Sequence, residues 1–354
     1  MSQQIEPVTH LAVIGASGRI GRRLLRLLAA RGPARRMRLL AVANSRASLI
    51  GHAGLDPLYA AERLGTSARV PGEAFAQALL ALPRPLTVVD CTANAQIAAH
   101  YPRWLAAGID IVTPNKHGPS ADRALFAAMA AAQCASGACL RDAATVGAQL
   151  PLLDTLRALH QAGDRVERFE AVLSGTLSFV LGRIAQGEAF SAAVREAVDL
   201  GYAEPDPGAD LSGEDAARKL VILLRALGHD IELAEVETVS LAESLAPQEL
   251  AQIDEQWRAR AAIAAARNER WIYRASFDGA RARVAPERVV ATHPLALLAP
   301  CENALILHSA YYHAAPLTIA GPGAGVELTA AAVFADLLAS ARAQLAQSTV
   351  EAAA

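Results

Sequence analysis

Short apolar runs alternate with amphipathic stretches over the first 142 residues of the chain. Runs at residues 10–14, 38–43, 86–90, 110–112 and 138–141 have the length and apolar character of buried strands. Between them, apolar residues recur at three- and four-residue spacing over residues 22–31, 95–107 and 120–133, which predicts helices. This alternation predicts an α/β fold, with a Rossmann-type parallel sheet in a nucleotide-binding domain over residues 1–142.

The pattern changes after residue 142. Helical spacing predicts helices over 152–161, 179–186, 191–200, 212–227 and 326–343, and it makes residues 232–270 mainly helical. Alternating and β-branched runs predict strands at 165–173, 271–277, 281–289 and 304–309. These strands predict an α+β catalytic and dimerisation domain over residues 143–320 with a mixed or antiparallel sheet. Because such sheets often form a dimer surface, we expect a homodimer.

The composition suits a soluble, well-buried enzyme and excludes several other classes. Hydrophobic residues make up 53% and charged residues 19% of the 354, and the net charge of −2 argues against a nucleic-acid partner. No apolar run reaches the ~18 residues needed to span a bilayer, so we expect no membrane partner. The N-terminal MSQQIEPVTH lacks the regions of a signal peptide, and the four cysteines show no CxxC spacing. We therefore expect a cytoplasmic protein with reduced thiols.

A glycine-rich loop follows the first predicted strand. Glycines let backbone amides approach a pyrophosphate at a helix N-terminus, where the helix dipole favours anions. The spacing is GxxGxxG rather than the strict GxGxxG, and such a loop alone can be a mere tight turn. Its place between a strand and an amphipathic helix favours dinucleotide binding. The cofactor-binding residues of this loop are then Gly15, Ser17, Gly18, Arg19, Ile20 and Gly21.

Three further turns follow predicted strands of the same domain. Residues 44–46 lack the acid that grips the ribose 2′-hydroxyl of NAD, whereas Arg46 could meet a 2′-phosphate. This favours NADP(H) and leaves NAD(H) possible, with an exposed loop arginine as the plain alternative. Residues 91–94 and 113–116 end the next strands, and open α/β sheets bind ligands at the carboxyl ends of their strands. These turns add Asn44, Arg46, Thr92, Ala93 and Lys116 to the cofactor-binding set.

The stretch from Leu200 to Leu227 places acidic residues ahead of a helix. A loop rich in glycine and proline carries Glu204, Asp206 and Asp210. Residues 212–215 have the pattern of a capping box at a helix start. Asp215 and Lys219 are four residues apart, so they share one helical face. They are either an ordinary ion pair or part of a site that the stiff loop helps to position.

Five segments of the chain resemble a known family. They are GYAEPDPGADLSGEDAARKL from Gly201, TPNK from Thr113, ATVGAQLP from Ala144, SGTLS from Ser174 and GPGAG from Gly321. The first is long and ungapped and resembles the signature segment of homoserine dehydrogenases. It is most similar to the dehydrogenase half of the bifunctional aspartokinase–homoserine dehydrogenases. The resemblance covers the chain from Leu11 to about Leu338.

The resemblance implies roles for individual residues. It implies catalysis by Lys219 and Lys116, and substrate binding by Glu204, Asp210, Asp215, Thr176 and Gly175. It also implies that the final segment, residues 321–354, returns as a helix to the nucleotide domain, with Gly323 and Gly325 near the cofactor.

A monovalent cation is a further implication of the resemblance. Main-chain carbonyls of Val146 and Ala148 would hold this cation near the domain junction. Two departures put the site in doubt, because Ala143 stands where relatives usually have an acid and Gln149 replaces a usual glycine.

The implied reaction is the NAD(P)-dependent interconversion of L-homoserine and L-aspartate 4-semialdehyde, in threonine and methionine biosynthesis. We expect carboxylates to hold the substrate ammonium, Lys219 to relay a proton, and Lys116 to act at the same oxygen. A dihydrodipicolinate reductase is one alternative, since it shares the GASGR-type opening, but it is usually shorter and carries a His-rich segment. A catalytically inactive nucleotide-binding protein is another, and both lysines argue against it.

Overall fold

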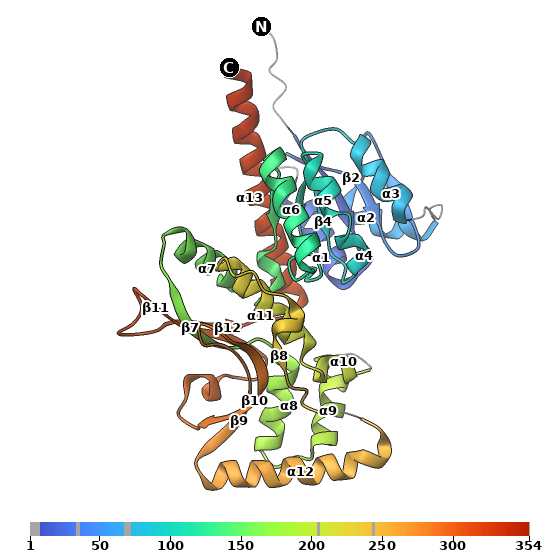
Figure 1. Ribbon diagram of the computed structural model, residues 1–354. Helices are drawn as coiled ribbons and strands as arrows, with labels where there is room; N and C mark the ends of the chain where they lie inside the picture. Colours follow the sequence, from blue (N-terminus) through green and yellow to red (C-terminus); the bar gives the residue numbers. More distant parts are fainter. Residues whose placement is uncertain (1–7, 33–35, 67–71, 204–205, 243–244, 354) are drawn as a thin grey trace. The chain divides into compact units, whose positions relative to one another are not determined.

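The computed structural model describes residues 8–32, 36–66, 72–203, 206–242 and 245–353 of the chain. The fold divides into two compact units (Figure 1). The first comprises residues 1–149 together with 325–354, and the second comprises residues 150–324. The boundaries predicted above fall at 142/143 and 320/321, several residues before these divisions.

A six-stranded sheet forms the centre of the first unit, in the order β3-β2-β1-β4-β5-β6. Its strands are β1 (Thr9–Ile14), β2 (Met37–Ala43), β3 (Ser48–Ile50), β4 (Leu86–Asp90), β5 (Asp110–Val112) and β6 (Leu140–Arg141). All neighbours are parallel except β2 and β3, which run antiparallel. The predicted Rossmann-type sheet is confirmed. Its central strands read as apolar runs because both faces are covered.

Helices lie on both faces of this sheet. They are α1 (Arg19–Arg31), α2 (Pro57–Arg63), α3 (Gly72–Ala78), α4 (Ala95–Ala98), α5 (Tyr101–Ala106), α6 (Arg123–Ser136) and α13 (Val326–Ala353). Leu11 and Val13 of β1 face a core formed with α1 and α13, whereas Ala12 and Ile14 face a core formed with α5 and α6. The helix predicted over 95–107 is wrong in part, because it is interrupted between α4 and α5, and Pro102 lies in the first turn of α5, where a proline is tolerated.

The second unit is built on another six-stranded sheet, in the order β12-β11-β7-β9-β10-β8. Its strands are β7 (Val166–Val172), β8 (Glu237–Thr238), β9 (Glu269–Phe277), β10 (Ala282–Val290), β11 (Glu302–Ser309) and β12 (Leu317–Pro322). Only the short pair β8–β10 is parallel, so the predicted mixed sheet is confirmed. The edge strands β8 and β12 were not predicted, since β12 is half-exposed along its length and β8 has two residues.

Six helices accompany this sheet. They are α7 (Leu152–Gln161), α8 (Gly175–Ala185), α9 (Phe190–Asp199), α10 (Gly208–Leu211), α11 (Glu214–Ala226) and α12 (Pro247–Ala266). Helices α8, α11 and α12 contact β9, and most residues of α11 are buried, which makes α11 a rigid support for the side chains at its start. The prediction that residues 232–270 are mainly helical is correct only for α12, because β8 interrupts the segment.

The predicted capping box at residues 212–215 is wrong. Helix α11 begins at Glu214, and its N-cap is Gly213 in a left-handed conformation with φ of 82° and no capping side chain. A Cβ atom at Gly213 would lie 1.8 Å from the Tyr273 hydroxyl, so the turn requires glycine for space as well as for φ. Ser212 instead ends the short helix α10, which also lies within the segment predicted as an irregular loop.

Two half-buried histidines make the stability of the first unit depend on pH. Burial lowers the pKa of His10 and of His100 below the ordinary value of 6.5. The unfolded chain therefore binds protons more readily than the folded one. The contribution of each histidine to stability is complete above its unfolded pKa and is lost as the pH falls through its folded pKa.

We predict a lower melting temperature at about pH 5.5 than at about pH 7.5, measured by differential scanning calorimetry. The pH range stays above the ordinary pKa values of carboxyl groups. A variant with His10→Gln and His100→Gln should lose much of this difference. An unchanged difference in the variant would assign the effect to other groups.

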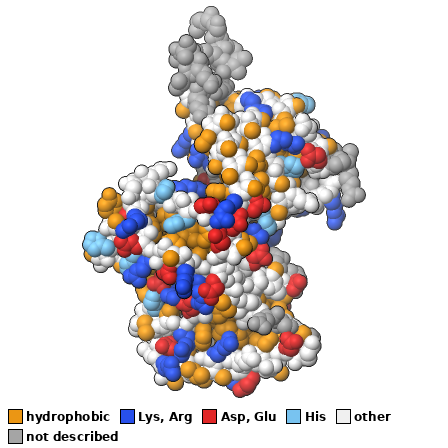
Figure 2. Space-filling model, in the orientation of Figure 1, with side chains coloured by type: hydrophobic (Ala, Val, Ile, Leu, Met, Phe, Trp, Pro, Cys, Tyr) orange, Lys and Arg blue, Asp and Glu red, His pale blue; other side chains and the backbone are white. Residues whose placement is uncertain are grey.

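Acidic and basic side chains are interspersed on the face shown in Figure 2, without a broad area of one sign. This distribution agrees with the small net charge of −2. Among the described residues, no helix combines the length and the apolar character needed to cross a bilayer.

Candidate active site

The glycine loop after β1 has the shape of a dinucleotide cradle. Gly15 has φ of 77°, and a Cβ atom there would lie 2.9 Å from the backbone carbonyl of Cys91. A Cβ atom at Gly21 would lie 2.2 Å from the Gly15 oxygen, so Gly21 allows α1 to start close against the loop. Helix α1 begins at Arg19 rather than at the predicted residue 22, with Gly18 as N-cap and no acid in its first turn. Its amide end is therefore suited to an anion, and the loop fits a pyrophosphate.

The other predicted cofactor residues of the first unit lie at the carboxyl edge of the same sheet. Asn44 follows β2, and its Oδ1 accepts hydrogen bonds from the amides of Arg46 and Ala47, both at 2.8 Å. These bonds fix the turn, while the Arg46 side chain is exposed. Thr92 and Ala93 follow β4, and Thr92 lies next to Gly15. The structure thus brings the glycine loop and the β4 turn together.

A buried network joins the turn after β4 to the turn after β5. The Asp90 carboxylate accepts hydrogen bonds from the Tyr101 hydroxyl at 2.6 Å, from Asn115 Nδ2 at 2.9 Å and from the Thr92 amide at 2.8 Å. Asn115 Nδ2 also donates to the Asn94 carbonyl at 3.0 Å. Burial and the Asp90 charge raise the pKa of Tyr101 far above its ordinary value, which keeps its hydroxyl a donor. The network fixes the backbone immediately before Lys116.

Lys116 is half-buried at this edge of the sheet. Its carbonyl accepts hydrogen bonds from the Ser120 amide at 2.9 Å and from the Ser120 hydroxyl at 2.7 Å. The backbone of Lys116 is thus held on both sides, by Asn115 before it and by Ser120 after it.

Lys219 of the second unit is held by two acceptors. Its Nζ lies 2.8 Å from Asp215 Oδ2 and donates to the Leu173 carbonyl at 2.7 Å. The Lys219 side chain is 13% exposed, so the ammonium is mostly withdrawn from water. Two acceptors occupy two of its three N–H donors, and the third can be offered to a substrate oxygen. The shared helical face predicted for Asp215 and Lys219 is confirmed.

The turn from β7 into α8 lies beside this lysine, because Leu173, which follows β7, accepts the Lys219 hydrogen bond. Ser174 is the N-cap of α8, and its hydroxyl accepts a hydrogen bond from the Leu177 amide at 3.2 Å. Helix α8 therefore begins at Gly175, not at the predicted residue 179. The Thr176 hydroxyl donates to the Tyr202 carbonyl at 2.5 Å, which ties the acidic loop to the start of α8.

Two of the predicted substrate-binding acids can be located. Asp210 lies in α10, which contacts both α8 and α11. Asp215 lies in the first turn of α11 and is 44% exposed, so it remains accessible while it pairs with Lys219. Glu204 lies outside the described residues.

The remaining predicted residues lie where the chain passes between the units. Val146 is fully buried, and Ala148 has φ of 50°, a left-handed conformation uncommon for alanine. Gly323 follows β12, and Gly325 precedes α13 with φ of 120°. The described residues contain no cluster of three His, Cys, Asp or Glu side chains suited to a metal ion. A cation in this region would therefore depend on carbonyls.

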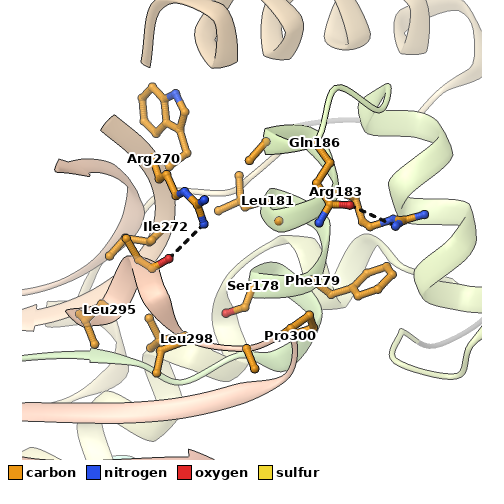
Figure 3. Close-up of a pocket in the computed structure, with 16 residues that line it drawn as sticks. Ser178, Phe179, Leu181, Arg183, Gln186, Arg270, Ile272, Leu295, Leu298 and Pro300 are labelled. Atoms are coloured by element: carbon orange, nitrogen blue, oxygen red, sulfur yellow. Dashed lines mark hydrogen bonds between the residues drawn. The ribbon is translucent and has the colours of Figure 1, made fainter. Parts of the chain in front are cut away.

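A cavity of about 330 Å³ lies elsewhere in the second unit, between α8, β9 and the segment after β10 (Figure 3). Leu181, Ile272 and Leu298 form apolar parts of its wall. Arg270 Nη1 donates weakly to the Ala296 carbonyl at 3.4 Å. None of the predicted site residues lines this cavity, so it is distinct from the surroundings of Lys219.

Several residues that were not predicted contact the candidate site directly or through a neighbour. Asp90 had a readable signal, since it ends an otherwise apolar strand. Tyr101, Asn303 and the Leu173 carbonyl gave no signal in the sequence, because their contacts join residues far apart in the chain.

Two family models match the chain. The model described as homoserine dehydrogenase matches residues 151–338. The model described as the NAD binding domain of homoserine dehydrogenase matches residues 17–141. Together they cover most of both units.

Individual relatives agree with these matches. The chloroplastic bifunctional aspartokinase/homoserine dehydrogenase 2 of Zea mays is 39% identical over 262 residues, covering 71% of this chain and 29% of that relative. The chain thus spans less than a third of this relative's length. The homoserine dehydrogenase of Emericella nidulans is 34% identical over 362 residues, covering 93% of this chain and 97% of the relative.

A solved structure shares the fold. The structure is a mutant of a hyperthermophilic archaeal homoserine dehydrogenase in complex with NADPH. Its TM-score is 0.75 at 23% identity, and the match covers 94% of this chain and 97% of that chain.

Proposed function

The chain belongs to the homoserine dehydrogenase family, and we propose that it interconverts L-homoserine and L-aspartate 4-semialdehyde with a nicotinamide dinucleotide. Both matching family models are those of homoserine dehydrogenase, which decides against the dihydrodipicolinate reductase alternative.

The observation that carries the proposal is that lysine occurs at only two positions in the chain. Of the 33 lysine and arginine residues in the chain, only Lys116 and Lys219 are lysines. An arginine guanidinium stays protonated in proteins, whereas a lysine amine can release and accept a proton. The chain uses arginine everywhere else for positive charge. It keeps the amine at the two positions where the resemblance implies catalysis.

In the direction of oxidation, the alcohol carbon of homoserine loses a hydride and its oxygen loses a proton. The bound cofactor supplies the hydride acceptor at C4 of its nicotinamide. Lys219 in its amine form accepts the proton from the substrate oxygen, and its ammonium returns it in the reverse direction. Asp215 and the Leu173 carbonyl hold Nζ in place during this exchange. Lys116 acts at the same oxygen and stabilises its negative charge.

Carboxylates hold the other end of the substrate in this proposal. Homoserine carries an α-ammonium, and Asp210 and Glu204 supply charges that attract it. The start of α8, at Gly175 and Thr176, is available to the substrate carboxylate through its amide end. A cation on the Val146 and Ala148 carbonyls stays a prediction, and no step here depends on it.

NADP(H) is the cofactor that we propose. No acid follows β2, and the Asn44 turn carries an exposed Arg46, which supports a role for its guanidinium in binding a 2′-phosphate. We predict that Arg46→Ala raises the KM for NADP⁺ about tenfold, because one charge-assisted contact is lost, with little change for NAD⁺. Steady-state kinetics with both cofactors measure the effect. Arg31→Ala, at the far end of α1, is the matched control. Equal effects on the two cofactors would refute the assignment of Arg46.

We propose that the second copy in a homodimer covers the turn after β11. Tyr311 and Tyr312 are 70% and 37% exposed, and tyrosine is enriched in protein–protein interfaces relative to the rest of protein surfaces. Asp164 accepts from the Tyr311 amide and Ser309 from the Tyr312 amide, so the backbone that carries both rings is fixed. Sedimentation equilibrium should give twice the 37.0 kDa chain mass, and Tyr311→Ser with Tyr312→Ser should shift it towards the monomer. A monomeric wild type would contradict the proposal.

The reaction is tested by following NADPH absorbance with homoserine and NADP⁺. Because the chain has only two lysines, an amine-selective reagent extends this test. We expect the reagent to abolish activity by modifying Lys116 and Lys219, as mapped by mass spectrometry, and homoserine with NADP⁺ to protect both. Full activity after both amines are modified would refute the proposal.

A cytoplasmic location stays a prediction, supported by four cysteines that are all free.

A further inference from the structure

Asn303 lies in β11 of the second unit and is 1% exposed. It has a close neighbour after β12, because a Cβ atom at Gly323 would lie 2.2 Å from Asn303 Cγ. Glycine at 323 therefore lets the Asn303 side chain occupy this space. The adjacent Ala304 pairs with Val172 of β7, which places Asn303 beside the end of that strand.

The Asn303 amide contacts the carbonyl that holds Lys219. Its Nδ2 lies 3.5 Å from the Leu173 oxygen, in a long hydrogen bond. The same oxygen accepts from Lys219 Nζ at 2.7 Å. Because a carbonyl only accepts, the amide must turn its NH₂ group towards Leu173, and Oδ1 then points away. One carbonyl thus lies between two donors from β11 and α11.

We propose that Asn303 is a positioning residue for Lys219. It holds the Leu173 carbonyl where that carbonyl can fix the ammonium beside the substrate oxygen. This inference rests on the proposed function, since it gives Lys219 the proton-transfer role. Without Asn303 the end of β7 has one donor fewer, and Nζ shifts with the oxygen to which it is bonded. Small shifts of a reacting group lower turnover severely.

The setting of Asn303 argues against a purely structural role. Its Oδ1 is buried without a hydrogen-bond partner in the described part of the chain, and an unsatisfied buried acceptor is destabilising. A leucine has the same branching and no polar atoms. Replacing a poorly satisfied polar group by an apolar one of similar shape can be neutral or stabilising. The chain therefore keeps an amide where stability alone would favour leucine.

The test compares two buried amides. Asn303→Leu should lower kcat for homoserine oxidation about tenfold or more, with the KM for NADP⁺ within about twofold of wild type and an unchanged or higher melting temperature. The matched control is Gln344→Met in the first unit, where Nε2 donates to Thr87 and Asp110. The control should lower the melting temperature and leave kcat unchanged, because Gln344 has no link to Lys219.

A second variant helps to distinguish a loss of catalysis from a loss of folding. Asn303→Asp keeps the shape but removes the donor to Leu173, and it should also lower kcat. The inference is overturned if Asn303→Leu and Asn303→Asp keep kcat within about twofold, or if both lower it only together with the melting temperature. Failure of both variants to fold would likewise make the residue structural. A wild type without homoserine-dependent NADP⁺ reduction refutes the proposed function itself, which is a separate outcome.

Discussion

Replacing Lys219 by alanine is expected to lower kcat for homoserine oxidation on the order of 10²–10⁴-fold. The variant loses the amine that accepts the proton. The KM for NADP⁺ should change little, because Lys219 belongs to α11 of the second unit, whereas the glycine loop belongs to the first unit. Steady-state and single-turnover measurements of NADPH formation separate the two parameters.

Helix α11 offers a matched control one residue earlier. Arg218 pairs with Glu214 at 2.7 Å with the same four-residue spacing as Lys219 with Asp215. Arg218→Ala removes a comparable ion pair and should leave kcat near wild type, since exposed pairs of this kind stabilise a helix by only ~0.3–0.5 kcal/mol. Lys219→Arg keeps the charge but cannot release a proton, so it should be nearly as inactive as Lys219→Ala. Near-normal turnover of Lys219→Arg would exclude proton transfer by this residue.

Replacing Lys116 by alanine is expected to lower kcat about 10²–10³-fold. In our account this ammonium stabilises negative charge on the substrate oxygen, and the backbone before it is fixed by Asn115 and Asp90. The same kinetic assay measures the loss. Asn115→Ala should reproduce part of it by loosening that turn.

The charge-preserving variant Lys116→Arg separates two roles for this residue. If Lys116 supplies only a positive charge, Lys116→Arg should keep most of the activity. If the substrate oxygen instead requires the compact ammonium of lysine, Lys116→Arg should lower kcat almost as much as Lys116→Ala. Turnover near wild type in Lys116→Ala would show that Lys116 does not act on the substrate.

Apolar runs in the sequence predicted most of the fold because buried strands have a simple pattern. The strands β1, β4 and β5 are nearly or wholly buried, and each was predicted close to its observed bounds. The edge strands β8 and β12 were not predicted, because β8 has only two exposed residues and the residues of β12 alternate between half-buried and exposed. The start of α11 was mispredicted because Ser212 and Asp215 match a capping box. The left-handed Gly213, packed against Tyr273, makes the actual turn.

The candidate site was predictable where one short segment carries the chemistry. The Asp215–Lys219 pair and the glycine loop each lie within a few residues, so spacing alone reveals them. The supports of these residues come from distant strands. The Leu173 carbonyl accepts from Lys219 of α11 and from Asn303 of β11, and no local pattern records contacts between residues so far apart in the chain.

A crystal structure of the protein with NADP⁺ and homoserine tests the central claim most directly. We predict that the Nζ atoms of Lys219 and Lys116 both lie about 3 Å from the homoserine hydroxyl oxygen, with the α-ammonium at the carboxylates before α11. Homoserine bound with its hydroxyl away from Lys219, or lysines that do not share the substrate oxygen, would contradict it.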